Sequence, residues 1–139
     1  MNKERRDKII ASYNKLYDHK DSSGRHSMRW GFECGDGWLD LIENLSCVIQ
    51  WHVDQKQGRD PTYEQVKVVQ CKEKFGSLRF YIYGGDEFID GAIAMAERMS
   101  AHICESCGNP GTLKREGWWG VTCDPCEVKK QEVRKNGGS

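Results

Sequence analysis

Two cysteine pairs near the end of the chain constrain its fold more than any other feature. The segment CESCGNPGTLKREGWWGVTCDPC has two residues inside each pair and 15 residues between the pairs. Two intervening residues let both thiolates of a pair point at one ion, and the whole layout is typical of four-cysteine zinc sites. We therefore predict one structural Zn²⁺ ion, bound by Cys104, Cys107, Cys123 and Cys126.

The residues around these cysteines predict a treble-clef-like zinc finger. Gly108 permits a tight turn after the first pair, and two short strands are expected around Glu116 and Gly117. Pro125 suits the first turn of a following helix, where its missing N–H is not needed. Four thiolates complete a tetrahedron, so no position remains for a catalytic water. A redox-active pair and four unmetallated thiols remain as alternatives.

Composition and charge limit the other classes of protein. The chain has 139 residues, 21 basic and 21 acidic, so no overall attraction to nucleic acid or to an anionic membrane is expected. Seven cysteines, an odd number, fit metal ligands and free thiols better than a disulfide framework. The start, MNKERRDKIIASYNK, lacks the features of a signal peptide, and no apolar run approaches the roughly 18 residues of a membrane span. These features predict a cytoplasmic protein.

Hydrophobic periodicity predicts an α+β fold with three helices packed on a small antiparallel β-hairpin. The helices are expected at about residues 3–20, 36–54 and 86–102, and the hairpin at about 64–84. Asp36 is the expected N-cap of the second helix. An α+β domain then covers 1–103, the zinc finger covers 104–135, and 136–139 form a tail.

Each predicted helix carries an apolar stripe, which we expect to face the core. In the second helix the stripe contains Trp38, Leu41, Ile42, Leu45, Val48, Ile49 and His52. In the third it contains Phe88, Ile89, Ala92, Met95, Ala96, Met99 and Ile103.

The hairpin offers the main candidate for a binding surface. An even-numbered loop places Cys71 and Val69 opposite Phe80 and Ile82 on one face. The other face then pairs Lys72 with Arg79, Gln70 with Tyr81, and Val68 with Tyr83. We predict that Lys72, Arg79, Tyr81 and Tyr83 contact a ligand or partner, because basic and aromatic side chains together can hold a phosphate or stack on a ring. The alternative is that the first helix covers this face.

Several further residues are weaker candidates for a site. Trp118 and Trp119 are second candidates for a contact, with at least one expected to pack beneath the zinc. Asp36, Asp40, Glu43 and Asp54 are expected on the solvated face of the second helix, where a cation site is the alternative. We interpret the three remaining cysteines, Cys34, Cys47 and Cys71, as buried or half-buried thiols, and His102 as a polar group at a helix end. The last helix is expected to be solvated, because its basic residues Lys129, Lys130, Arg134 and Lys135 are interleaved with Glu127 and Glu132.

Three motifs carry a resemblance over about residues 28–126. They are GFECGDGW at 31–38, EKFGSLRFY at 73–81, and ICESCG with GWW and CDPC at 103–126. With them the chain resembles a group of small proteins carried by tailed phages and prophages. The resemblance implies a phage accessory role in the host cytoplasm, without implying a chemistry. In many such relatives the last ligand position is His where this chain has Cys126.

The leading hypothesis is a non-enzymatic zinc-containing protein that binds a host protein or a small nucleotide-like ligand, with inhibition of host defence as one role. The first alternative is a nucleic-acid-binding protein that uses the finger and its basic last helix. The second is a metal-dependent hydrolase that uses Asp36, Asp40, Glu43 or His52 with a second metal ion. No nucleophile, base and orienting group come together in the sequence, so enzymatic activity is the least favoured reading.

Overall fold

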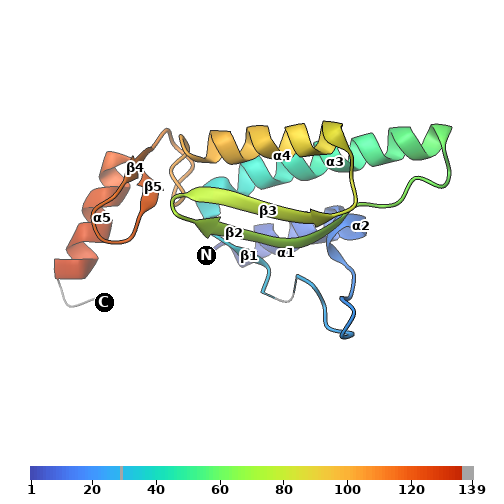
Figure 1. The fold of residues 1–139 in the computed structure, drawn as a ribbon. Coiled ribbons are helices and arrows are strands. Elements are labelled where there is room, and N and C mark those ends of the chain that lie inside the picture. The colour runs from blue at the N-terminus through green and yellow to red at the C-terminus, as the bar shows by residue number, and fades with distance from the viewer. Residues whose placement is uncertain (29, 136–139) are drawn as a thin grey trace.

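The computed structural model describes residues 1–28 and 30–135; the predicted tail at 136–139 lies outside them. The fold is α+β, with a small sheet and helices packed on one of its faces (Figure 1). Its sheet has three strands, β1 (Phe32–Glu33), β2 (Lys67–Lys74) and β3 (Ser77–Tyr83), in that order. The sequence predicted β2 and β3 but not β1, which pairs with β2 in parallel, with Phe32 beside Cys71. A two-residue strand is too short to show a period in the sequence.

The first predicted helix is broken into two. Helix α1 runs over Lys3–Ser12 and α2 over Asn14–Tyr17, with Tyr13 between them at φ −120° and ψ 42°. The break turns Leu16 and Tyr17 into the core, where both are fully buried and Tyr17 packs edge-on against Phe32. Tertiary packing therefore decides where this helix ends.

The two long helices lie side by side on the sheet. Helix α3 covers Leu39–Arg59 and follows a 3₁₀ turn, η1 (Asp36–Trp38); α4 covers Glu87–Ser100. Trp38, not Asp36, occupies the N-cap position of α3, so the predicted capping role of Asp36 is wrong. Asp86 does cap α4, accepting a hydrogen bond from the backbone N–H of Ile89.

The hairpin has the predicted even register near its tip. Cys71 pairs with Phe80, Lys72 with Arg79 and Gln70 with Tyr81 across a two-residue turn at Phe75 and Gly76. Beyond Gln70 an irregularity shifts the register by one residue, so Val68 pairs with Ile82 and Lys67 with Tyr83. The predicted placement of Val69 on the inner face is therefore wrong: Val68 is fully buried and Val69 is exposed. A bulge reverses the facing of every residue beyond it, and it has no simple pattern in a sequence.

The free edge of β3 is closed by side chains of α4. The backbone N–H of Leu78 donates to the Ser100 hydroxyl at 2.8 Å, and that of Phe80 donates to the Glu97 carboxylate at 3.0 Å. Since these groups are the donors that an added strand would need, the edge is blocked against strand pairing at this point.

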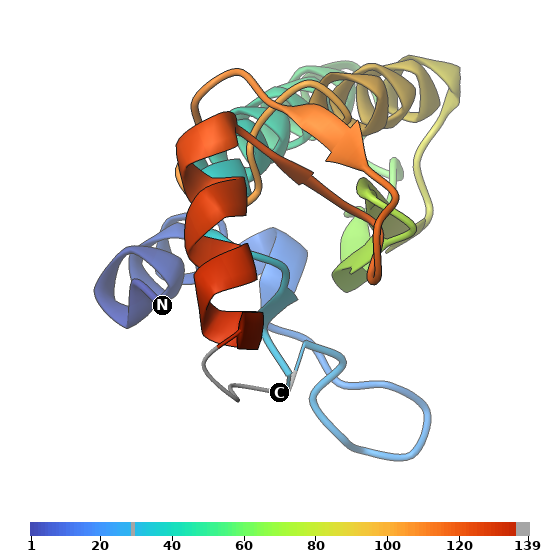
Figure 2. The same ribbon diagram turned by 90° about the vertical axis from the view of Figure 1, so that its left-hand side faces the viewer.

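The last part of the chain lies at one end of the sheet and helices (Figure 2). It contains strands β4 (Thr112–Lys114) and β5 (Gly120–Thr122), which pair antiparallel, and helix α5 (Asp124–Lys135). No helix of the described residues is long and apolar enough to cross a membrane.

Candidate metal centre

The fold brings the four predicted cysteines together. Cys104 and Cys107 lie in a tight loop, in which the N–H of Gly108 donates to the Cys104 carbonyl at 2.9 Å. Gly108 has a φ of +86°, a conformation that glycine adopts without strain, as the sequence predicted. Cys123 directly precedes α5, and Cys126 lies in its first turn, one residue after Pro125.

The sulfur atoms have the spacing of a tetrahedral metal site. All four lie within 4.8 Å of one another, and those of Cys107 and Cys123 are 3.6 Å apart. A tetrahedron with metal–sulfur distances of about 2.3 Å has edges of about 3.8 Å, whereas a disulfide bond is about 2.05 Å long. The arrangement therefore fits four ligands around one ion and does not fit a disulfide.

The thiols differ in how readily they ionise. Burial opposes ionisation of Cys104, but backbone N–H groups of Cys123, Cys107 and Ser106 point at its sulfur and lower its pKa to about 7. The neighbouring Cys123 thiol raises the pKa of Cys126 to about 12. Four thiolates this close repel one another, so the fully ionised set requires a cation between them.

The donor set also limits what the centre does. Four protein thiolates complete a tetrahedron and leave no position for water, so an ion held there is structural. His102 is exposed and lies outside the group of ligands. Among residues 1–28 and 30–135, these cysteines are the one group of His, Cys, Asp and Glu side chains arranged to hold a metal ion.

A glycine motif far away in the sequence holds the first cysteine pair. The backbone N–H of Gly37 donates to the Glu105 carbonyl at 2.7 Å, and that of Gly35 donates to the Glu105 carboxylate at 2.8 Å. A Cβ on Gly37 would lie 2.0 Å from the Cys104 carbonyl oxygen, so only glycine fits this contact. The indole N–H of Trp38 adds a bond to the Ile103 carbonyl at 2.9 Å. This role of the GDGW segment was not predicted from the sequence, because Gly35 and Glu105 are 70 positions apart.

The acidic residues proposed as an alternative cation site bind basic or amide side chains instead. Asp36 accepts from the buried Arg6, which also donates to the carbonyls of Phe32 and Cys34 at 2.6 Å each. Asp40 and Glu43 both accept from Arg5, and Asp54 accepts from Gln50. The contacts of Arg5 and Arg6 attach α1 to η1 and the start of α3, and within residues 1–28 and 30–135 these carboxylates form no group arranged to hold a metal ion.

His52 belongs to a polar cluster at the other end of α3. Its Nε2 lies 2.7 Å from the Asp86 carboxylate, which also accepts from the Tyr63 hydroxyl at 2.8 Å. Burial opposes ionisation of Asp86, but these bonds lower its pKa to about 2. The His52 ring stacks on Phe88 at 4.2 Å. Among the described residues no buried side-chain nitrogen or oxygen lacks a hydrogen-bond partner, and this cluster attaches α4 to α3.

The predicted contact residues of the hairpin lie on the outer face of the sheet. Tyr81 and Tyr83 are 43% and 62% exposed, and Lys72 and Arg79 are half-buried, so the first helix does not cover them. Gln70 on this face donates to the Glu33 carboxylate of β1 at 3.2 Å. We call this surface the outer sheet face; Lys67, Lys74 and Val69 extend it.

The two tryptophans of the finger are both exposed. Trp118 is 87% and Trp119 46% accessible, so the prediction that one packs beneath the metal is wrong. Trp119 instead meets Phe75 at the tip of the β2–β3 hairpin, with ring centroids 6.4 Å apart, and Arg115 covers its ring. The predicted finger therefore contacts the hairpin tip and the GDGW segment.

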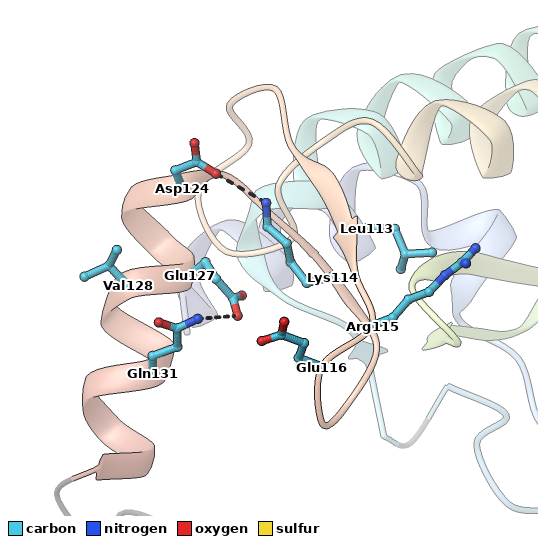
Figure 3. A pocket seen from close by; sticks show the side chains of 8 residues that line it. All are labelled: Leu113, Lys114, Arg115, Glu116, Asp124, Glu127, Val128 and Gln131. Carbon is cyan, nitrogen blue, oxygen red and sulfur yellow. Dashed lines mark hydrogen bonds and ion pairs between the residues drawn. The ribbon is translucent and has the colours of Figure 1, made fainter.

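A cleft of about 730 Å³ separates the β4–β5 hairpin from α5 (Figure 3). Two of its charged groups pair with each other, Lys114 with Asp124 at 3.3 Å, and the buried Glu127 accepts from the Thr122 hydroxyl at 2.9 Å. Glu127 is thus an exception to the predicted solvated helix, whereas Lys129, Arg134 and Lys135 are exposed. The cleft has mixed charge and no unpartnered buried group that indicates a ligand.

The other cysteines do not join the metal centre. Cys34 and Cys71 are buried, and burial raises the pKa of the Cys71 thiol. Cys47 is exposed on α3, which differs from its predicted burial. Comparison of the chain with protein-family models, with curated proteins and with solved structures finds no match.

Proposed function

We propose that this protein is a non-enzymatic binding protein whose treble-clef-like finger is held by one structural Zn²⁺ ion and whose outer sheet face contacts a host protein. The observation that carries the proposal is the outer sheet face itself, where Tyr81 and Tyr83 are exposed beside the half-buried Lys72 and Arg79.

Zinc is the ion that best suits the centre. Thiolate ligands in a tetrahedron select zinc or iron, and zinc is the usual ion of structural four-cysteine sites. The order of a tight loop with one cysteine pair, a hairpin, and a second pair at a helix start is that of a treble clef. This order supports the predicted finger class.

The character of the outer sheet face favours a macromolecular partner with an acidic surface. It carries Lys67, Lys72, Lys74 and Arg79 against Glu33, although the whole chain is neutral. Pockets for small ligands are concave, whereas this surface is an open strand face with two protruding tyrosines. A nucleotide-like ligand is therefore less well supported than a protein whose acidic groups meet the lysines and whose apolar groups meet Tyr81 and Tyr83.

The phage-type setting, in which the partner is a protein of the infected cell and a defence protein is one target, rests on the motif resemblance. Under this proposal the partner is bound and blocked rather than chemically changed. The residues of the hydrolase alternative are already engaged: Asp36, Asp40 and His52 each have a partner in the same chain.

The test is capture from infected and uninfected host lysate with the tagged full chain, read by mass spectrometry for proteins and by native mass measurement for retained small molecules. Arg79→Ala with Tyr81→Ala should remove the captured protein, because each such contact contributes about 1–3 kcal/mol. Arg115→Ala with Trp118→Ala is the matched control, since it removes the same two kinds of side chain from the finger. A partner lost only in this control assigns the contact to the finger and rejects the outer sheet face.

Nucleic acid is the alternative outcome of the same experiment. Its binding would depend on Lys129 and Lys135 of α5 and would fall steeply with salt, because counterions are released from phosphates. Retention of a protein partner at moderate salt separates the two functions.

A further inference from the structure

Helices α3 and α4 carry more apolar surface than the sheet covers. Several residues that the sequence assigned to the core stripe point away from the sheet. The exposed fractions are 40% for Val48, 48% for Phe88, 63% for Met95 and 44% for Met99, and Trp51 beside them is 56% exposed. These residues form a continuous second face, which we call the outer helix face.

The outer helix face has a hollow and a projection. The hollow is an apolar groove of about 400 Å³ between the two helices; its walls include Leu41, Leu45, Val48, Met95 and Met99. The projection is formed by Trp51 and Phe88, whose ring centroids are 6.4 Å apart. It lies toward the C-terminal end of α3, about 10 Å along the helix from the groove centre near Leu45, at a rise of about 1.5 Å per residue.

From this shape we propose that the outer helix face binds a second copy of this chain, forming a two-fold symmetric dimer. The two-fold axis would lie in the plane of the interface, at right angles to the helices, and pass near Val48. It brings α3 of one copy against α3 of the other, with the two helices running in opposite directions. It places the Trp51–Phe88 projection of each copy over the groove of the other. A face that carries both a projection and a matching hollow is self-complementary, which is the requirement for an isologous interface.

Charges on α4 agree with the same axis. Glu87 and Arg98 lie at opposite ends of α4, both exposed, and neither forms an ion pair with another described residue of this chain. The midpoint between them falls beside Ala92 and Ile93. Because Phe88 stacks on His52 and the helices run in opposite directions, that midpoint lies level with Val48. The axis that exchanges projection and groove therefore also brings Arg98 next to the Glu87 of the other copy.

The size of the face suits a dimer. The five exposed side chains present on the order of 500 Å² of apolar surface, at the upper end of what a typical monomer leaves in one patch. A stable interface buries roughly 800 Å² on each partner, so this apolar centre and a polar rim supply the required area. The outer sheet face lies on the opposite side of the sheet, so both surfaces can be occupied at once. The dimer would present two contact faces to the partner of the proposed function, but it does not depend on that function.

The test is the mass of the zinc-loaded full chain in solution, by light scattering and native mass spectrometry at about 0.1 mM. The wild type should have twice the 16.0 kDa chain mass. Trp51→Glu and Met95→Lys should each raise the dissociation constant by at least about 30-fold, as for a central contact residue. Arg98→Glu should weaken the dimer and Glu87→Arg in the same chain should restore it.

Tyr83→Glu, on the outer sheet face, is the control and should leave the dimer intact. Circular dichroism should be unchanged in all variants, since each substituted side chain is exposed. A monomeric wild type, or a dimer that Trp51→Glu and Met95→Lys leave unchanged, would overturn the proposal. So would loss of the dimer in the Tyr83→Glu control.

Discussion

The two parts of this molecule are stabilised in opposite ways. The sheet and the helices up to α4 enclose a hydrophobic core that includes Trp38, Ile42, Ile49 and Leu78, all fully buried. In the finger, the buried apolar residues among the described positions 104–135 are Cys104 and Val121, and Cys104 is one of the four cysteines that could hold a metal ion. A segment of about 30 residues with so little burial does not fold on hydrophobic energy alone.

From this difference we expect a metal ion held by the four cysteines to take the place of a core in the finger. In the first part many apolar contacts each contribute a little, so the loss of one is tolerated. An ion held by the four cysteines would join the tight loop, the hairpin and α5, so the loss of one ligand should disorder all three. Both parts meet at the GDGW segment, which belongs to the first part and binds the second by backbone contacts.

The largest expected effect is on the finger. Cys107→Ser should remove zinc and disorder the chain after Ile103, while the helices of the first part persist, because structural zinc contributes on the order of 10 kcal/mol in finger peptides. Metal analysis and limited proteolysis measure this outcome. Cys47→Ser, a free exposed thiol on α3, is the control and should change neither readout. A protease-resistant finger in the Cys107→Ser variant would show that the finger does not need the ion.

The next effect concerns the core. Ile42→Ala and Leu45→Ala should each reduce the free energy of unfolding by about 2–5 kcal/mol, whereas Asp40→Asn should change it by less than about 1 kcal/mol. Denaturant titration measures both, and zinc content should stay at one per chain throughout. If Asp40→Asn abolished an activity without affecting stability, the hydrolase alternative would be favoured instead.

A smaller effect tests the junction of the two parts. Gly37→Ala forces a Cβ against the Cys104 carbonyl and should cost about 1–3 kcal/mol, with protease sensitivity appearing in the finger first. Gly58→Ala in α3 is the matched control, because nothing lies within 4 Å of its added Cβ and alanine favours a helix. Equal stability of the two variants would mean that the close contact is not needed.

The smallest effect is a pH dependence in the first part. The pKa of Asp86 is about 2 in the folded protein, against 3.8 ordinarily. A group with a lowered pKa stabilises the fold above its unfolded pKa, so this contribution is present above about pH 4 and is lost as the pH falls toward 2. The loss should amount to about 1–2 kcal/mol. Urea titration between pH 5 and about 2 should show this loss in the wild type, and Asp86→Asn should lack it. A pH dependence that is unchanged in Asp86→Asn would assign it to other carboxylates.

The two parts also differ in how much of their structure could be predicted from the sequence. The ligands follow from spacing, because two residues between cysteines fix a local geometry, and the structure brings the same four together. The long helices follow from periodicity. The positions of Val48, Met95 and Met99 did not, because a broad apolar stripe does not show which half of it a sheet will cover.

The remaining differences are long-range effects. The parallel pairing of Phe32 with Cys71 and the engagement of Asp36 by Arg6 join residues 30 or more positions apart, and the bulge at Val69 depends on how β2 pairs with β3. The contact between Gly37 and Glu105 is of the same kind. None of these leaves a local period, so spacing alone does not reveal them.

X-ray absorption at the zinc edge of the purified full chain tests the central claim most directly. We predict one zinc per chain, with four sulfur ligands at about 2.3 Å and no nitrogen or oxygen in the first shell. A sample without zinc, or a spectrum with water or histidine nitrogen among the ligands, would contradict the account of a closed structural centre formed by Cys104, Cys107, Cys123 and Cys126.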